Sequence, residues 1–175
     1  MTDDSAASGL PSPGTYRLDP DASRIHYVGR HLLGAGTVRA SFAATRGELR
    51  LAGTIAGSRV SVTVDAASFT SGNARRDRDV RGRRLLDAAT YPDITFECDR
   101  WRSAGGRWVA GGAVTAHGAT VPVDLVVERV VPEGTGLRVH GRAEHVDRTA
   151  FGITGVRGLA GRYLDLEVDA AFVPA

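Results

Sequence analysis

The chain has 175 residues, of which 42% are hydrophobic and 24% are charged, and its formal net charge is +2. This length suits one domain that buries roughly two-thirds of the surface of its unfolded chain, and so small a net charge does not indicate a nucleic-acid-binding protein. Cys98 is the one cysteine, which excludes an internal disulfide and a thiolate-rich metal site.

Residues 1–13 are small and polar, contain two prolines and have no apolar run. We predict a disordered lead-in here, followed by a single domain over residues 14–175. The lead-in lacks the basic and apolar segments of a secretory signal, so we expect a cytoplasmic location. No run of about 18 apolar residues occurs, so we expect no transmembrane segment.

Alternation of apolar and polar residues recurs along the rest of the chain, as in Val60, Val62 and Val64. Period-two alternation is typical of antiparallel strands with one dry face and one wet face. Turns rich in glycine and proline separate about eight or nine such segments, which predicts a sandwich or a barrel. The expected strands cover 15–19, 23–29, 36–51 with a bend near Gly47, 57–66, 93–101, 107–115, 119–130, 136–147 and 162–172.

Residues 73–89 interrupt this pattern with six arginines between Arg75 and Arg84. We expect a short helical insert that crosses one mouth of the barrel, either as a lid that gates access or as a plug. Pro92 then starts a new strand, because proline cannot continue a helix or donate to a sheet ladder. Cys98 falls on the apolar face of that strand and is expected to be a buried, inert thiol.

The insert and the strand after it resemble the signature of the YceI-like family, lipocalin-like barrels that hold isoprenoid lipids. The matching residues are Arg76, Asp77, Arg81, Asp87, Tyr91, Pro92, Ile94, Thr95 and Phe96. Further matches extend from Tyr16 to Phe172, whereas Ala22 and Asp79 stand where the family usually has histidine. The resemblance implies an all-β fold, an antiparallel eight-stranded lipocalin-like barrel, that binds or carries a quinone or polyprenyl lipid without catalysis.

The interior of a small barrel is either filled by side chains or lined around one slender ligand. Strand parity and the motif matches predict the lining residues, each of which also suits a solid core. They are Ile25, Tyr27, Val38, Phe42, Val62, Val64, Ile94, Phe96, Val123, Leu125 and Phe151, with Leu85 and Leu86 capping from the insert. Burial of about 400 Å² of lipid releases on the order of 10 kcal/mol before the cost of association, which is enough for binding without a head-group contact.

Five polar residues are candidates for contact with a head group: Arg76, Asp77, Arg81, Tyr91 and Arg148. Guanidinium groups suit phosphate oxygens, whereas the match of the first three to the family motif implies a buried ion pair that anchors the insert. For the other four arginines of the insert, a solvated helix face with local arginine–aspartate pairs is favoured over a site for a pyrophosphate or other anionic head group at the barrel mouth.

An enzyme is the alternative class, namely an isomerase or cyclase of small apolar metabolites that uses Tyr27, Tyr91 or Arg148. No nucleophile elbow or phosphate-binding glycine loop occurs in the sequence. His140 and His145 are five apart on one expected strand and so face opposite ways, and we predict neither a metal site nor a cofactor.

Two adjacent leucines beside Gly34 suggest a contact between two copies of the chain. We expect a homodimer, with Leu32 and Leu33 in an exposed turn at the contact or, in a monomer, at the rim of the lipid portal.

Overall fold

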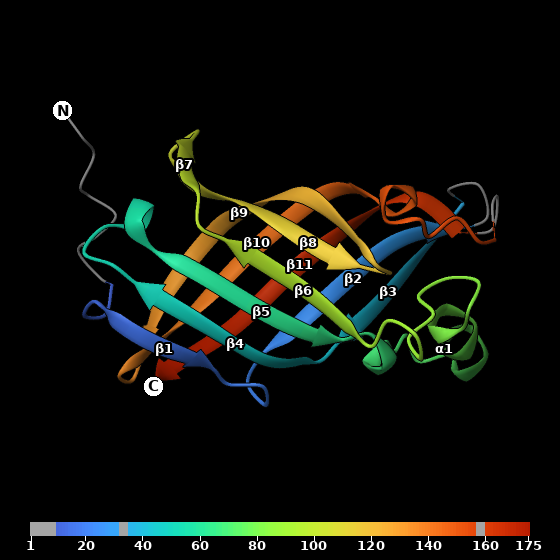
Figure 1. The fold of residues 1–175 in the computed structure, drawn as a ribbon, viewed down its shortest axis with the longest axis horizontal. Helices are drawn as coiled ribbons and strands as arrows, with labels where there is room; N and C mark the ends of the chain where they lie inside the picture. The colour runs from blue at the N-terminus through green and yellow to red at the C-terminus, as the bar shows by residue number, and fades with distance from the viewer. Residues whose placement is uncertain (1–9, 32–34, 157–159) are drawn as a thin grey trace.

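The protein, seen in a computed structural model that describes residues 10–31, 35–156 and 160–175, is an elongated barrel of long strands (Figure 1). The strands are β1 Gly14–Leu18, β2 Arg24–His31, β3 Gly36–Phe42, β4 Ala44–Leu51, β5 Arg59–Asp65, β6 Asp93–Cys98, β7 Trp101–Ala104, β8 Arg107–Ala116, β9 Ala119–Glu133, β10 Gly136–Asp147 and β11 Ala160–Pro174. The helices are α1 Ala74–Arg81 and the short 3₁₀ helices η3 Ile55–Gly57, η4 Ala66–Ser68 and η5 Arg148–Phe151. Most of the predicted lead-in, and both Leu32 and Leu33, lie outside the described residues.

The barrel closes through its first and last strands. The antiparallel circuit runs β1-β4-β5-β6-β8-β9-β10-β11, and β11 then pairs with β1 through Tyr16↔Pro174 and Leu18↔Phe172. The predicted fold class, an all-β, eight-stranded antiparallel barrel with a short helical insert, is confirmed. The alternating apolar side chains of these strands therefore face a common interior.

Two of the expected strands are each divided in two. The segment 36–51 breaks at Ala43, whose amide donates to Ser68 Oγ at 2.8 Å, and β4 runs without interruption through Gly47. A Cβ at Gly47 would lie 2.8 Å from the Ser61 carbonyl oxygen, so this glycine permits close packing of neighbouring strands. The segment 93–101 becomes β6 and the start of β7, which forms a small hairpin with β8.

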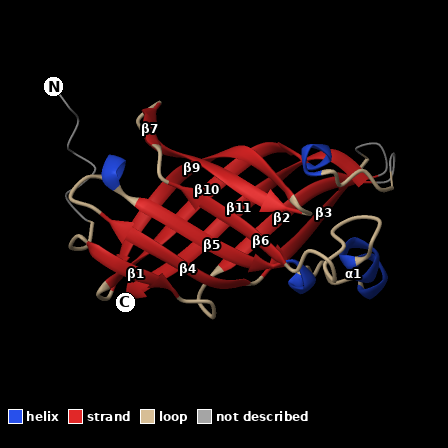
Figure 2. Cartoon of the chain, viewed as in Figure 1, coloured by secondary structure: helices blue, strands red, loops and turns tan. Residues whose placement is uncertain are grey.

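At one end of the barrel, β2 and β3 extend past the closed circuit. β11 pairs with β2, and β2 pairs with β3. Among the described residues, the other edge of β3 has no strand partner and forms only the isolated bridge Ser41↔Thr70. The insert between β5 and β6, which carries α1, covers this end (Figures 1 and 2). Among the described residues, no helix has the length and apolar character needed to cross a membrane.

The family-motif residues of the insert hold α1 to the segment before it. The buried Asp77 carboxylate accepts a hydrogen bond from the Ser71 amide at 2.9 Å, and Arg76 Nε donates to Ser71 Oγ at 2.8 Å. Arg81 Nε donates to the carbonyl oxygen of Phe69 at 2.9 Å. These side chains therefore anchor the helix through serine and backbone groups and do not pair with one another.

Candidate ligand-binding cavity

Two adjoining cavities occupy the barrel. The inner cavity, of about 220 Å³, lies between the strands, and the vestibule, of about 350 Å³, lies beneath α1. The two cavities adjoin each other at the α1 end of the barrel, because six residues line both of them: Tyr27, Phe42, Leu86, Arg148, Ile153 and Leu164.

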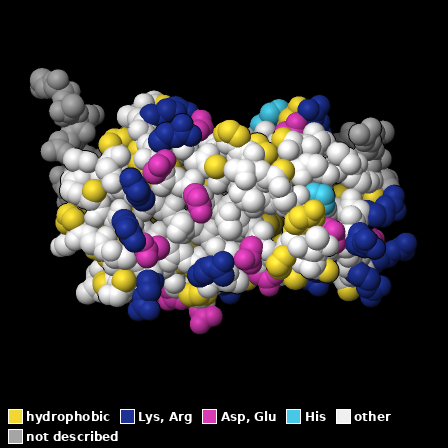
Figure 3. Space-filling model, viewed as in Figure 1, with side chains coloured by type: hydrophobic (Ala, Val, Ile, Leu, Met, Phe, Trp, Pro, Cys, Tyr) yellow, Lys and Arg dark blue, Asp and Glu magenta, His cyan; other side chains and the backbone are white. Residues whose placement is uncertain are grey.

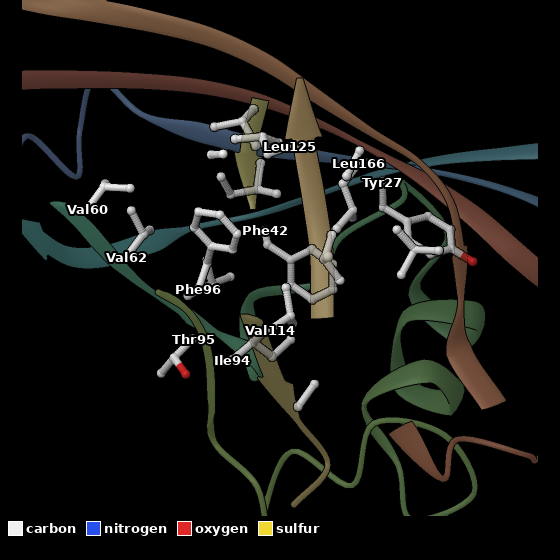
Figure 4. Close-up of a pocket in the computed structure, with 18 of the residues that line it drawn as sticks. Tyr27, Phe42, Val60, Val62, Ile94, Thr95, Phe96, Val114, Leu125 and Leu166 are labelled. Atoms are coloured by element: carbon white, nitrogen blue, oxygen red, sulfur yellow. The ribbon is translucent and has the colours of Figure 1, made fainter. Parts of the chain in front are cut away.

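Hydrocarbon side chains from almost every strand line the inner cavity. Val60 and Val62 on β5 and Ile94 and Phe96 on β6 point into it, and Leu125 and Leu166 come from other strands (Figure 4). The strand alternation explains this, because residues two apart on one strand face the same side. The lining contains few polar groups, which suits an apolar ligand.

Two glycines let aromatic rings lie against the barrel wall. A Cβ at Gly29 would come within 2.6 Å of ring carbons of Tyr27, and one at Gly112 would come within 2.5 Å of the Phe96 ring. Tyr27 also packs edge-on against Phe69, with ring centroids 5.8 Å apart. The Tyr27 ring is thereby held at the junction of the inner cavity and the vestibule.

The same junction carries the main polar groups. Arg148 is 7% exposed, and its guanidinium donates to the carbonyl oxygens of Ile153 at 2.7 Å, Gly161 at 2.7 Å and Ala160 at 3.0 Å. Burial raises the pKa of the Tyr27 phenol, and the positive charge of Arg148 partly offsets that rise. The junction therefore presents a neutral phenol and a guanidinium, which can donate hydrogen bonds to a ligand oxygen.

The vestibule is more polar than the inner cavity. Arg76 and Asp79 border it from α1 and Arg30 borders it from β2, while Val80 and Leu85 contribute apolar surface. The insert thus supplies both hydrocarbon and charged groups to the vestibule.

The sequence model of the YceI-like domain matches residues 16–172. The chain belongs to the YceI-like family. A UPF0312 protein of Vibrio parahaemolyticus is 36% identical over 77 residues, and the match spans 43% of this chain and 41% of that relative.

Two solved structures share the YceI-like fold at low sequence identity. Burkholderia cenocepacia BcnA has a TM-score of 0.72 and 23% identity, over 88% of this chain and 98% of that one. A polyisoprenoid binding domain from Saccharophagus degradans has a TM-score of 0.69 and 14% identity, over 94% and 100% of the two chains. At these identities the likeness shows the fold alone.

Every apolar residue predicted to contact a ligand borders one of the two cavities of this YceI-like barrel. Val38 and Leu85 border the vestibule alone. Those on the inner cavity are Ile25, Tyr27, Phe42, Val62, Val64, Leu86, Ile94, Phe96, Val123, Leu125 and Phe151. Contact of these residues with a ligand stays a prediction.

The five polar candidates divide into two groups. Arg76 and Arg148 border the cavities, whereas Asp77 and Arg81 line a separate dip on the other side of α1. Tyr91 borders neither cavity, and its ring lies 4.7 Å from that of His117. His117 also places Nδ1 3.2 Å from the Phe151 carbonyl oxygen.

Sequence reasoning missed part of the lining. The alternation of Leu164, Leu166 and Val168 was visible in the sequence, but nothing in it showed which strands face the widest part of the interior. The other missed residues are Leu49, Val60, Thr95, Trp101, Ala110, Val114, Ala116, Val127, Val139, Ala143, Val146, Ile153 and Phe172 in the inner cavity, and Arg30, Phe69, Asp79, Val80, Val156 and Ala160 in the vestibule.

Proposed function

We propose that this YceI-like barrel binds or carries a long-chain isoprenoid lipid of the quinone or polyprenyl type and does not transform it. The observation that carries the proposal is the apolar inner cavity, which adjoins the vestibule beneath α1. The neighbour from Saccharophagus degradans is described as a polyisoprenoid binding domain, which supports the same ligand class here.

The volumes suit a slender chain. A dry cavity of about 150 Å³ accommodates benzene, or about 25 Å³ per carbon atom. On that scale the inner cavity of about 220 Å³ takes about nine carbons, close to two isoprene units, and the vestibule takes about three more units. Nine buried carbons at about 0.8 kcal/mol each contribute about 7 kcal/mol before association costs, so the vestibule contacts are needed for micromolar affinity.

The polar groups favour a ligand that carries oxygen at one end. Tyr27 and Arg148 stand at the junction of the cavities and Arg76 stands in the vestibule. A chain of about two isoprene units in the inner cavity would place its head group near Tyr27 and Arg148, whereas a longer chain that also fills the vestibule would place it beyond the junction, on the side of Arg76. Both a quinone carbonyl and a phosphate accept hydrogen bonds from such groups.

Native mass spectrometry and a lipid titration test the proposal. We expect freshly purified protein to carry a lipid of several hundred daltons, and the emptied protein to take up a dansyl-labelled prenyl lipid. Failure both to recover a lipid and to take up the prenyl probe would refute it.

A pair of substitutions locates the binding site. Val62→Phe places about four more carbons in the inner cavity, which removes about 100 Å³ of the space open to a ligand on the same scale, and should weaken uptake at least tenfold. Val173→Phe makes the same change at an external position that is 42% exposed, and should leave uptake unchanged. Both proteins should be checked for native circular dichroism. Wild-type affinity in a folded Val62→Phe protein would place the lipid elsewhere, and failure of Val62→Phe and other lining variants to fold would mark these positions as core.

An isomerase or cyclase is the second candidate, because a neutral phenol and a guanidinium face a dry cavity. Such groups can donate a proton or stabilise developing charge. In that case Tyr27→Phe should abolish turnover of an apolar metabolite while leaving its binding intact. A carrier would show binding without a product in either protein. The cytoplasmic location and the homodimer stay predictions.

A further inference from the structure

Exposed arginines occur over the whole surface and differ in whether they pair with a carboxylate. Outside the insert some are paired, as in Arg46–Asp93 at 3.4 Å and Arg102–Asp124 at 2.6 Å, and others, such as Arg100 and Arg107, form no ion pair with a described residue. On the insert, four exposed arginines form no ion pair with any described residue, and we call them the mouth arginines: Arg75, Arg78, Arg83 and Arg84.

Among the described residues, none of the three aspartates of the insert, Asp77, Asp79 and Asp87, forms an ion pair with a mouth arginine. Asp77 is buried and its carboxylate accepts hydrogen bonds from the amide and hydroxyl groups of Ser71. Asp79 borders the vestibule. The local arginine–aspartate pairs expected from the sequence are therefore absent from the described part of the insert.

Charge is concentrated at this pole of the molecule. Residues 74–88 contain six arginines and three aspartates, a net charge of +3, whereas the whole chain carries +2. The remainder of the chain is thus at −1. Figure 3 shows arginine side chains gathered over the end where α1 lies in Figure 1.

The mouth arginines lie on the insert that covers the vestibule. The vestibule lies beneath the same helix and is bordered by Arg76, Val80 and Leu85 of the insert. The backbone of Arg84 packs against Gly155 in the segment after η5, because a Cβ at Gly155 would lie 2.8 Å from the carbonyl carbon of Arg84. A partner that contacts the mouth arginines therefore lies against the insert that covers the vestibule.

We propose that this pole docks on the surface of an anionic phospholipid bilayer. The inference rests on the proposed function, because a bilayer is the medium from which an apolar chain would pass into the vestibule. Unpaired guanidinium groups complement the phosphates of anionic lipids. The eight residues of α1 are too few to cross the hydrocarbon layer, so the contact is peripheral and electrostatic.

A nucleic acid fits this pole less well. Residues 74–90 contain no aromatic side chain on which a base can stack. Contacts with nucleic-acid phosphates would also make no use of the apolar cavities. A bilayer accounts for both the charge and the cavity, and a nucleic acid accounts for the charge alone.

Sedimentation of the full chain with phosphatidylcholine vesicles, with and without phosphatidylglycerol, tests the proposal. We expect binding at low salt to the anionic vesicles only, and release as salt rises. Each arginine near an anionic surface contributes about fivefold to partitioning, so Arg83→Gln combined with Arg84→Gln should weaken binding about 25-fold. A duplex oligonucleotide that binds where anionic vesicles do not would overturn the inference.

A matched variant separates the mouth from net charge. Arg100 and Arg107 are exposed, form no ion pair with a described residue and lie near β7 at the other end of the barrel. Changing both to glutamine alters net charge equally and should leave vesicle binding within about twofold of wild type, on the same scale. An equal loss in both double variants would overturn docking by the mouth.

Prenyl-probe uptake in solution distinguishes this inference from the proposed function. The Arg83→Gln, Arg84→Gln protein should take up the probe with wild-type affinity, because neither side chain lines a cavity. Uptake without anionic-vesicle binding by the wild type would refute the docking inference alone. Vesicle binding without uptake would refute the proposed function and leave docking supported.

Discussion

A methyl group at position 29 is expected to displace the Tyr27 ring. A Cβ there would lie 2.6 Å from two ring carbons of Tyr27, whereas carbon atoms in contact are usually about 3.5–4.0 Å apart. Tyr27 cannot yield freely, because its ring packs against Phe69 at 5.8 Å. Overpacking of this kind costs about 1–3 kcal/mol, and a loss of about 2 kcal/mol lowers Tm by about 4–8 °C in a chain of this size. Without the clash, alanine in place of a strand glycine would be neutral or stabilising.

A double-mutant cycle isolates the clash. Tyr27→Leu removes the ring, so adding Gly29→Ala to that protein should cost less than about 0.5 kcal/mol, with a coupling energy of about 1–2 kcal/mol between the sites. Urea unfolding monitored by the fluorescence of Trp101 and Trp108 measures all four proteins. Additive costs, with Gly29→Ala equally harmful in both backgrounds, would show that the ring does not depend on the glycine.

Three further predictions concern buried polar groups. Asp77→Ala should cost about 1–3 kcal/mol and speed hydrogen exchange of the Ser71 amide, because that donor loses its acceptor. Asp79→Ala removes an exposed carboxylate of α1 that borders the vestibule and should leave this exchange unchanged, so equal exchange in the two variants would contradict the anchoring role. Burial raises the pKa of Tyr27 above its usual 10.0, so its contribution to stability is full below about pH 10 and is lost as pH rises through the folded-state pKa. Tyr27→Phe should therefore reduce the alkaline loss of stability in urea titrations, and an unchanged loss would assign it to other groups. Burial also raises the pKa of Cys98, so iodoacetamide should label the native thiol more slowly than the urea-unfolded one at pH about 8, and equal rates would contradict burial.

Strand positions were predictable wherever the backbone keeps a regular alternation. β10 has the bounds expected from its sequence pattern, 136–147. The same reasoning fails at irregular backbone, as in the register shift between Ala143 and Val146. His145 has a φ of +57° there and stacks on Tyr163 at 3.8 Å, so parity counted from His140 no longer fixes the face of His145. Bulges of this kind depend on pairing partners that one strand's sequence does not contain.

In the candidate site, too, some residues were predictable from the sequence and others were not. Ile94 and Phe96 were predictable because strand parity and the family motif agree at these positions. Tyr91 matches the motif equally well, yet it packs against His117 and borders neither cavity. A motif records which residues a fold requires without separating those that contact a ligand from those that hold an element in place. Trp101 shows the reverse case, since its place on the inner cavity follows from a strand break after Cys98 that no local signal marks.

The pairing of β11 on both sides has a consequence for biosynthesis. β11 contacts β10 along one edge and β2 and then β1 along the other, so residues from opposite ends of the chain, such as Leu18 and Phe172, become neighbours. A ribosome must release almost the entire polypeptide before these partners can meet, and such distant pairings fold slowly. Until then, the nascent chain exposes unpaired strand edges and an apolar interior, which are the surfaces that holdase chaperones recognise and that drive aggregation.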